Sequence, residues 1–387
     1  MTAAARKAFD DAVALEQSGN LDKALVSYLK AQELAPQDTE IAYRTASALL
    51  QAGYLEEAQS QLRRIVFAEP EHLNARGSLG SCQLLQGDLE NAQQNFRDVL
   101  DQAPDNRNAL FGLATVLLKE GRAAEAERLA RSLVELLPET PAVLTLFAET
   151  QGKTGQVPAS IAAYRKALKI DPEHTPALIG LSEILLLRKR YDEVIELAVR
   201  ASQLSKTDAY PLSLLSDALS GKGALEDARE ASEAALELDP QSFLATMQLS
   251  ILSRKLGDPV SALRYALAAH DKDTSAAEPF NALGSVLASL KYATEARKVL
   301  TGQTSQKELE PAVRQLIESL IAEERDRELV PEKSKVHTKL ENESVETSLD
   351  AAQHQSETST VLLSNEPLRP GVEGKPNVLG LNRQDRS

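Results

Sequence analysis

The sequence has no tryptophan, a single cysteine and few aromatic residues, which make up 4% of its 387 residues. The single cysteine, Cys82, excludes an internal disulfide and a zinc site of the CxxC type. Basic residues are outnumbered, and the net charge of −14 argues against nucleic acid or an anionic membrane as a partner, because both require a basic surface.

Long hydrophobic runs are also missing. No window approaches eighteen uninterrupted apolar residues, so the sequence predicts no membrane-spanning helix. The first residues, MTAAARKAFDDAVALEQ, carry charges every few positions, unlike a signal peptide. We therefore expect a soluble protein of the cytoplasm.

Helix-forming residues, chiefly Ala and Leu, dominate what remains, whereas β-branched residues are sparse. This composition predicts an all-α protein. The 42% of hydrophobic residues is ample for a buried core.

A period of 34 residues runs through the chain without insertion or deletion over nine units. Steps of 34 from Pro104 reach a column of prolines that only Lys206 interrupts: Pro36, Pro70, Pro104, Pro138, Pro172 and Pro240. A glycine column, with Lys189 and Lys291 in its two remaining places, holds Gly19, Gly53, Gly87, Gly121, Gly155, Gly223 and Gly257. Two further columns hold mostly Ala, Gly or Ser.

Each column has a physical reason, which residues 107–140 illustrate. Two apolar helical runs flank KEGR, where Gly121 supplies the turn with positive φ that ends one helix and lets the next fold back. Ala114 and Ala126 suit a close approach of two helix axes, and Pro138 ends the second helix. One such hairpin cannot bury both of its faces, so the units must stack into a solenoid.

This pattern resembles the tetratricopeptide repeat family. The resemblance rests on the period, the closing proline, Leu–small pairs such as Leu113–Ala114, and the pairing of Ala92 with Phe96 in the second helix. The usual tryptophan is replaced by Leu144, Leu178 or Phe280. A helical-hairpin family that binds RNA has a period of 35 and basic groove positions, and the acidic surface counts against it.

The resemblance covers residues 5–310 as nine repeats and implies a right-handed α-solenoid. The repeats are 5–38, 39–72, 73–106, 107–140, 141–174, 175–208, 209–242, 243–276 and 277–310. Pro311 opens a further amphipathic helix over 311–327, which we interpret as a capping helix. Residues 328–387 are rich in Ser, Thr, Glu and Gln, and we expect a disordered tail. Two denser stretches, STVLLSNEP and KPNVLGLNRQDRS, are either short linear motifs or uninformative tail.

No catalytic constellation stands out, so we expect no enzyme and no cofactor or metal. The five histidines are scattered, and no Gly-rich phosphate loop is present. Cys82 lies next to a small-residue column, which favours a buried packing thiol.

The family resemblance implies that the first helix of each repeat lines a concave groove that binds a protein or peptide segment. A known version clamps a terminal carboxylate with Lys, Asn and Arg at fixed places. The corresponding places here hold Phe9, Val13, Arg44, Asn74 and Ser78, so chaperone tails are disfavoured as partners.

The same columns place Glu149, Glu183 and Asp217 at the ninth positions of repeats 5, 6 and 7. We expect them to form an acidic row in the groove, among the apolar or aromatic residues Phe111, Leu118, Ile179, Leu186, Tyr210, Leu214, Leu244 and Met247. Such a surface suits a basic or amphipathic segment of another protein. The alternative is a solvated row that keeps the groove soluble.

The sequence thus predicts a non-catalytic scaffold or adaptor. An auxiliary subunit of an enzyme or secretion assembly, bound through convex or terminal surfaces, is the alternative. Repeat 6 is irregular, with Lys189, Val194 and Lys206 in the glycine, alanine and proline columns, so it is either a softer joint or ordinary sequence drift.

Overall fold

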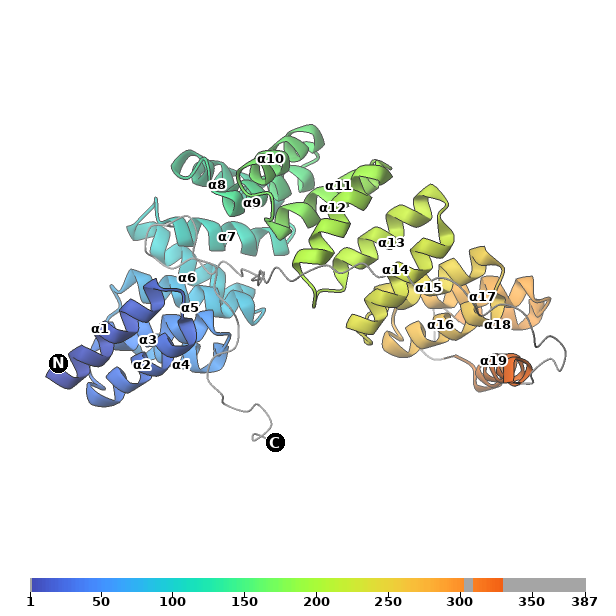
Figure 1. Cartoon of the computed structure of the whole chain (residues 1–387), viewed down its shortest axis with the longest axis horizontal. Coiled ribbons are helices and arrows are strands. Elements are labelled where there is room, and N and C mark those ends of the chain that lie inside the picture. The colour runs from blue at the N-terminus through green and yellow to red at the C-terminus, as the bar shows by residue number, and fades with distance from the viewer. Residues whose placement is uncertain (1, 303–308, 330–387) are drawn as a thin grey trace, which may run out of the picture. The chain divides into compact units, whose positions relative to one another are not determined.

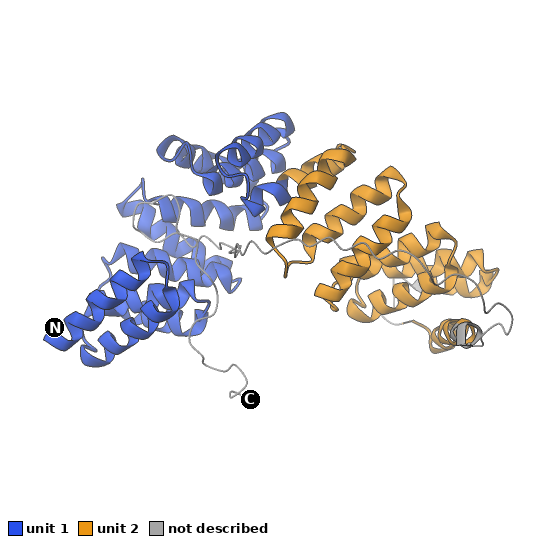
Figure 2. Cartoon of the chain, viewed as in Figure 1, with its two compact units in different colours: residues 1–180, 356–387 blue, residues 181–355 orange. Residues whose placement is uncertain are grey.

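The computed structural model describes residues 2–302 and 309–329 (Figure 1). These residues form α-helices, turns and short connections, and no strand occurs among them. The predicted tail lies outside the described residues from 330 onward. The described chain falls into two compact units with their boundary between Gly180 and Leu181, inside the irregular repeat 6 (Figure 2).

The prediction of nine two-helix repeats is confirmed. In repeats 1 to 5, the paired helices are α1 (Ala3–Gln17) and α2 (Leu21–Leu34), α3 (Thr39–Gln51) and α4 (Leu55–Ala68), α5 (Leu73–Leu85) and α6 (Leu89–Gln102), α7 (Arg107–Lys119) and α8 (Ala123–Leu136), and α9 (Pro141–Lys153) and α10 (Val157–Ile170). In repeats 6 to 9, they are α11 (Thr175–Leu187) and α12 (Tyr191–Leu204), α13 (Tyr210–Lys222) and α14 (Leu225–Leu238), α15 (Phe243–Leu256) and α16 (Pro259–Lys272), and α17 (Glu278–Ser289) and α18 (Ala293–Gly302). We call the first helix of each repeat its A helix and the second its B helix.

The glycine column makes the predicted turns between A and B helices. All seven of its glycines have positive φ, between 76° and 85°. The two lysines that interrupt the column adopt the same left-handed conformation, with φ of 58° at Lys189 and 70° at Lys291. The turn geometry is therefore kept even where a side chain must be accommodated in it.

Buried alanines and leucines form the core between helices, and three aromatic rings, those of Phe96, Tyr164 and Tyr191, fill space that glycines leave open. Phe96 on α6 is fully buried, and a Cβ at Gly80 or Gly112 would overlap its ring. Tyr164 on α10 lies against Gly180 in the same way. Cys82 is buried, as its place in the sequence predicted, and this burial raises the pKa of its thiol to about 12.

Helix α19 (Pro311–Leu329) follows the ninth repeat and packs against α16, the B helix of repeat 8. Its residues Val313 and Ile317 are buried in one cluster with residues of α16, α17 and α18. Arg314 fixes the orientation with two hydrogen bonds to the carboxylate of Asp271, 2.8 and 2.9 Å long. The predicted amphipathic helix thus exists and buries its apolar face.

Candidate functional site

Several neighbouring A helices contact one another directly within each unit. In unit 1, α3 contacts α5, α5 contacts α7 and α7 contacts α9, and in unit 2, α13 contacts α15 and α15 contacts α17. Each of these contacts skips the intervening B helix. Where these A helices meet they form a layer of their own, and their exposed side chains form a candidate binding surface of each unit.

Unit 2 carries the most distinctive group of side chains on this layer. Tyr210, at the start of α13, is exposed, and its hydroxyl donates a 2.8 Å hydrogen bond to Oε1 of Glu183 on α11. Burial, the hydrogen bond to Glu183 and the charges of Glu183 and Asp217 all raise the pKa of Tyr210. The hydroxyl therefore stays protonated and serves as a donor to the carboxylate.

Asp217, seven residues after Tyr210 on α13, is the second carboxylate of the group. Burial raises its pKa, and a hydrogen bond from Gln248 and the charge of Lys255 oppose that rise without cancelling it. The buried Gln248 also donates a 2.9 Å hydrogen bond to the carbonyl of Ser213, whereas its own Oε1 has no partner among the described residues. The carboxyl group of Asp217 is thus harder to ionise than an exposed one.

Exposed aliphatic side chains occur on the same A helix as Glu183 and on the A helix that follows α13. Leu187, at the end of α11, is 83% exposed, and Leu244 and Ile251 on α15 are also exposed. We call this set of residues the acidic A-face: Glu183, Leu187, Tyr210, Asp217, Leu244 and Ile251. Leu187 and Ile251 were missed in the sequence, although they stand at the thirteenth position of repeat 6 and the ninth of repeat 8, columns that were already considered groove-facing.

The other predicted groove residues fall into two groups. Leu214 and Met247 are buried, so they support the layer from beneath rather than line it. The remaining four apolar residues are half-buried: Phe111, Leu118, Ile179 and Leu186. Phe111 and Leu118 pack against the core of unit 1.

The predicted acidic row is divided between the two units. Glu149 is exposed on α9 and belongs to unit 1, whereas Glu183 and Asp217 belong to unit 2. Within unit 2, Tyr210 links the helices of the two carboxylates, because its hydroxyl contacts Glu183 and its own helix carries Asp217.

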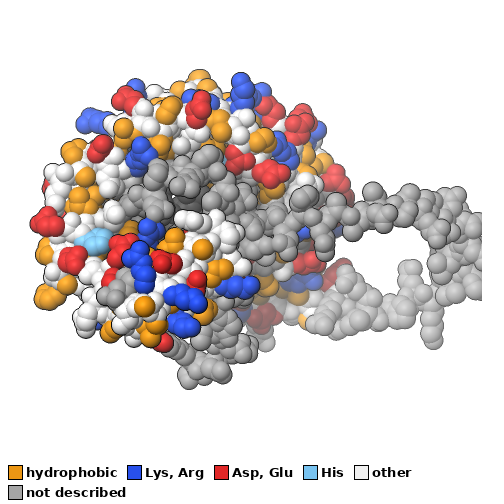
Figure 3. Space-filling view, turned by 60° about the vertical axis from the view of Figure 1, so that its left-hand side comes forward, with side chains coloured by type: hydrophobic (Ala, Val, Ile, Leu, Met, Phe, Trp, Pro, Cys, Tyr) orange, Lys and Arg blue, Asp and Glu red, His pale blue; other side chains and the backbone are white. Residues whose placement is uncertain are grey.

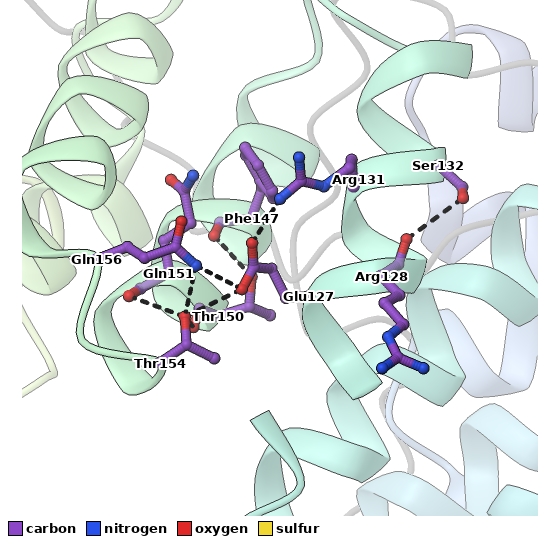
Figure 4. Close-up of polar contacts among 9 residues, drawn as sticks. All are labelled: Glu127, Arg128, Arg131, Ser132, Phe147, Thr150, Gln151, Thr154 and Gln156. Atoms are coloured by element: carbon purple, nitrogen blue, oxygen red, sulfur yellow. Dashed lines mark hydrogen bonds and ion pairs between the residues drawn. The ribbon is translucent and has the colours of Figure 1, made fainter. Parts of the chain in front are cut away.

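A different carboxylate, Glu127 on α8, is buried in unit 1 and serves the fold. It accepts hydrogen bonds from Arg131 (2.7 Å), Thr154 (3.0 Å) and Gln156 (2.7 Å), as Figure 4 shows. Burial disfavours the ionised form, but the hydrogen bonds from Gln156, Arg131 and Thr154 outweigh it and hold the pKa of Glu127 below its usual range. The B helix of repeat 4 is thereby joined to the turn of repeat 5.

Outside the A layer, one side chain stands out. Phe67, near the end of the B helix α4, is 90% exposed. On the face drawn in Figure 3, by contrast, acidic and basic side chains are interleaved and hydrophobic ones are scattered among them. Over residues 2–302 and 309–329, no helix is both long enough and apolar enough to cross a membrane.

Comparisons with known proteins agree with this architecture. Three family profiles, each described as "Tetratricopeptide repeat", match residues 83–149 and 153–218, residues 43–94, and residues 12–38 and 210–242. Together these segments cover more than half of the sequence, and the chain belongs to the tetratricopeptide repeat family. Among proteins with curated descriptions, none matches this sequence.

Two solved structures show the same fold at low identity. A tetratricopeptide repeat protein from Parabacteroides merdae ATCC 43184 is 16% identical, with a TM-score of 0.51 over 64% of this chain and 98% of its own. A structure of the APC/C hetero-tetramer Cut9–Hcn1 is 15% identical, with a TM-score of 0.55 over 83% of this chain and 67% of that chain. MamA from Desulfovibrio magneticus RS-1 is 21% identical and matches 44% of this chain and 96% of its own, with a TM-score of 0.40. Repeats of this family are generally protein-interaction modules without catalytic activity, which supports an interaction scaffold.

Proposed function

We propose that this protein is a non-catalytic, cytoplasmic scaffold or adaptor that binds a basic, amphipathic peptide segment of a partner protein along its A helices. The observation that carries the proposal is the acidic A-face of unit 2. Two carboxylates and three exposed aliphatic side chains lie on its A helices, and the A helices of unit 1 separately carry Glu149, Phe111 and Leu118. A peptide with Lys or Arg next to Leu, Ile or Val complements this chemistry.

The energetic contributions divide between charge and apolar contact. Covering an exposed leucine such as Leu187 contributes about 1.5–3 kcal/mol. An exposed ion pair contributes only about 0.2–1 kcal/mol, and a half-buried carboxylate such as Asp217 more. The carboxylates therefore select a basic segment, and the leucines supply much of its affinity.

The test is a peptide library screened against the full chain, followed by measured affinities for the peptides that bind. We expect bound peptides to be enriched in Lys or Arg beside aliphatic residues. The double variant Glu183→Lys and Asp217→Lys is expected to weaken binding at least tenfold, and added salt to weaken it further.

A matched control is available on the B helix of the same repeat. Glu230→Lys and Glu237→Lys on α14 make the same charge change at two exposed positions outside the A layer. This control is expected to bind as the parent does. Equal binding by the acidic A-face variant and this control would overturn the proposal.

The exposed Phe67 favours a second candidate, an auxiliary subunit held in a larger assembly through a B-helix surface. An exposed aromatic side chain is the kind of anchor that dominates protein interfaces. A partner that co-purifies with the chain, is lost with Phe67→Ala and is retained by the acidic A-face variant would support this second candidate instead.

A further inference from the structure

We propose that residues 375–387 of this same chain, KPNVLGLNRQDRS, bind the acidic A-face of unit 2 and occupy it until a partner segment displaces them. This inference rests on the proposed function, because it assigns a regulator to the same surface. Segment 375–387 lies outside the described residues. The argument comes from the charge of the surface, the composition of the segment and the length of chain between them.

The two carboxylates of this surface can accept a cation from an occupant. The partner of Glu183 is the neutral hydroxyl of Tyr210, and Asp217 retains a raised pKa despite its hydrogen bond from Gln248. Of the lysines nearby, Lys222 pairs with Asp192, and Lys255, whose charge lowers the pKa of Asp217, donates a 2.9 Å hydrogen bond to Ser220. A cation brought to Glu183 or to Asp217 would therefore gain a carboxylate partner.

The surface also leaves aliphatic side chains uncovered. Leu187 is almost fully exposed at one end, and Leu244 and Ile251 are exposed on α15. An occupant must therefore bring apolar side chains as well as a cation. A purely basic segment would leave this apolar area in water.

Segment 375–387 has both properties in one short run. Its cations are Lys375, Arg383 and Arg386, and Asp385 is its single acidic residue. Val378, Leu379 and Leu381 lie between the cations. Cations and aliphatic side chains thus both occur within these thirteen residues, as the composition of the surface requires.

The connecting chain is long enough. Helix α19 ends at Leu329, so residues 330–374 separate it from the segment. For 45 residues, random-coil statistics give a root-mean-square end-to-end distance of roughly 35–40 Å. Neighbouring helices pack about 10 Å apart, so returning from repeat 9 to repeats 6–8 within unit 2 requires a span on the order of 20–30 Å. The matching lengths favour an effective concentration in the millimolar range.

A second basic run, KSKVHTKL (residues 333–340), serves as an internal comparison. Its lysines lie four, six and ten residues beyond Leu329, so at about 3.5 Å per residue only the last of them spans the full required distance. It also carries only two aliphatic residues, Val336 and Leu340, and they are not adjacent. We therefore assign the surface to residues 375–387 and use this run as the control.

The experiment measures fluorescence anisotropy of a labelled peptide, GKPNVLGLNRQDRS (residues 374–387), with the full chain. Three forms of the chain are compared: the parent, the variant Lys375→Glu, Arg383→Glu and Arg386→Glu, and the control variant Lys333→Glu, Lys335→Glu and Lys339→Glu. We expect the first variant to bind the peptide at least tenfold more tightly than the parent or the control, because its own segment no longer competes.

The site of binding is checked in the 375/383/386 variant background. Adding Glu183→Lys and Asp217→Lys is expected to abolish peptide binding, whereas adding Glu230→Lys and Glu237→Lys is expected to leave it intact. Light scattering at two protein concentrations is expected to show a monomer at both. A mass that rises with concentration would assign the segment to a second copy and overturn binding within one chain.

Other outcomes separate this inference from the proposed function. If parent and 375/383/386 variant bind the peptide equally, and Glu183 and Asp217 are still required, intramolecular occupancy is overturned while the acidic A-face stands as a peptide site. If the peptide does not bind, the inference is overturned, and the library screen decides the proposed function by itself. If the peptide binds regardless of Glu183 and Asp217, the acidic A-face is not its site.

Discussion

At the scale of single residues, the left-handed backbone conformation of Lys189 is expected to lower the stability of the protein. A residue with a Cβ in this conformation carries a steric penalty that glycine avoids. We expect Lys189→Gly to stabilise the protein by about 0.5–1 kcal/mol, with the midpoint of urea unfolding, followed by circular dichroism, moving upward. The converse change, Gly155→Lys, is the control: it introduces the same penalty at φ 81° and is expected to lower the midpoint. A midpoint that falls with Lys189→Gly would contradict this account.

The same scale shows what the sequence could and could not predict. The glycine column predicted the positive φ at Gly121 because only backbone geometry is involved, and the small-residue columns predicted burial for the same reason. The hydrogen bond between Tyr210 and Glu183 could not be predicted, since it depends on two side-chain rotamers in different repeats. Nor could the burial of Leu214 and Met247, because a groove position in the repeat pattern does not reveal how closely the next A helix packs over it.

At the scale of elements, the contacts of Glu127 join α8 to the turn between α9 and α10. Its folded pKa lies below the ordinary carboxyl value, so the ionised form contributes stability that is fully present above the ordinary carboxyl pKa. This contribution is lost as the pH falls through the folded pKa. We expect Glu127→Gln to cost about 1–2 kcal/mol at neutral pH, because hydrogen bonds to a charged acceptor are replaced by weaker ones.

The measurement is urea unfolding of parent and Glu127→Gln over a range of pH. The stability difference between them is expected to shrink as the pH is lowered into the acid range. Glu125→Gln, an exposed neighbour on the same helix whose pKa is lowered mainly by its hydrogen bond from Arg122, is the matched control and should show a smaller difference at neutral pH. A pH-independent difference for Glu127→Gln would mean that the packing of this side chain, and not its charge, stabilises the contact between α8 and the turn between α9 and α10.

At the scale of the whole molecule, repeat 6 is expected to be a weak point at which the array unfolds in separate steps. The stability of a repeat array is approximately a sum of repeat and neighbour terms, so an array with one weak repeat can unfold in parts. Repeat 6 has a strained Lys189 and no closing proline at Lys206, whose N–H donates no backbone hydrogen bond among the described residues. We expect the parent to unfold in two steps in urea, and Lys189→Gly combined with Lys206→Pro to bring the steps together.

Changing the equivalent turn elsewhere provides the comparison for that prediction. Lys291→Gly removes the same kind of strain in repeat 9, away from the boundary between units, and is expected to stabilise without merging the two steps. A single transition for the parent, coincident by circular dichroism and by tyrosine fluorescence, would show that repeat 6 is no weaker than its neighbours.

The placement of Phe96 restricts how this array can evolve. Its ring belongs to repeat 3, but part of the space it needs is left by Gly112 in repeat 4. Tyr164 and Gly180 form a second such pair between repeats 5 and 6. These repeats therefore cannot be exchanged for one another. A duplication, deletion or shuffling that separates a ring from its glycine would create either a steric clash or a cavity. The smallest unit that can be inherited intact is, in these places, a pair of repeats.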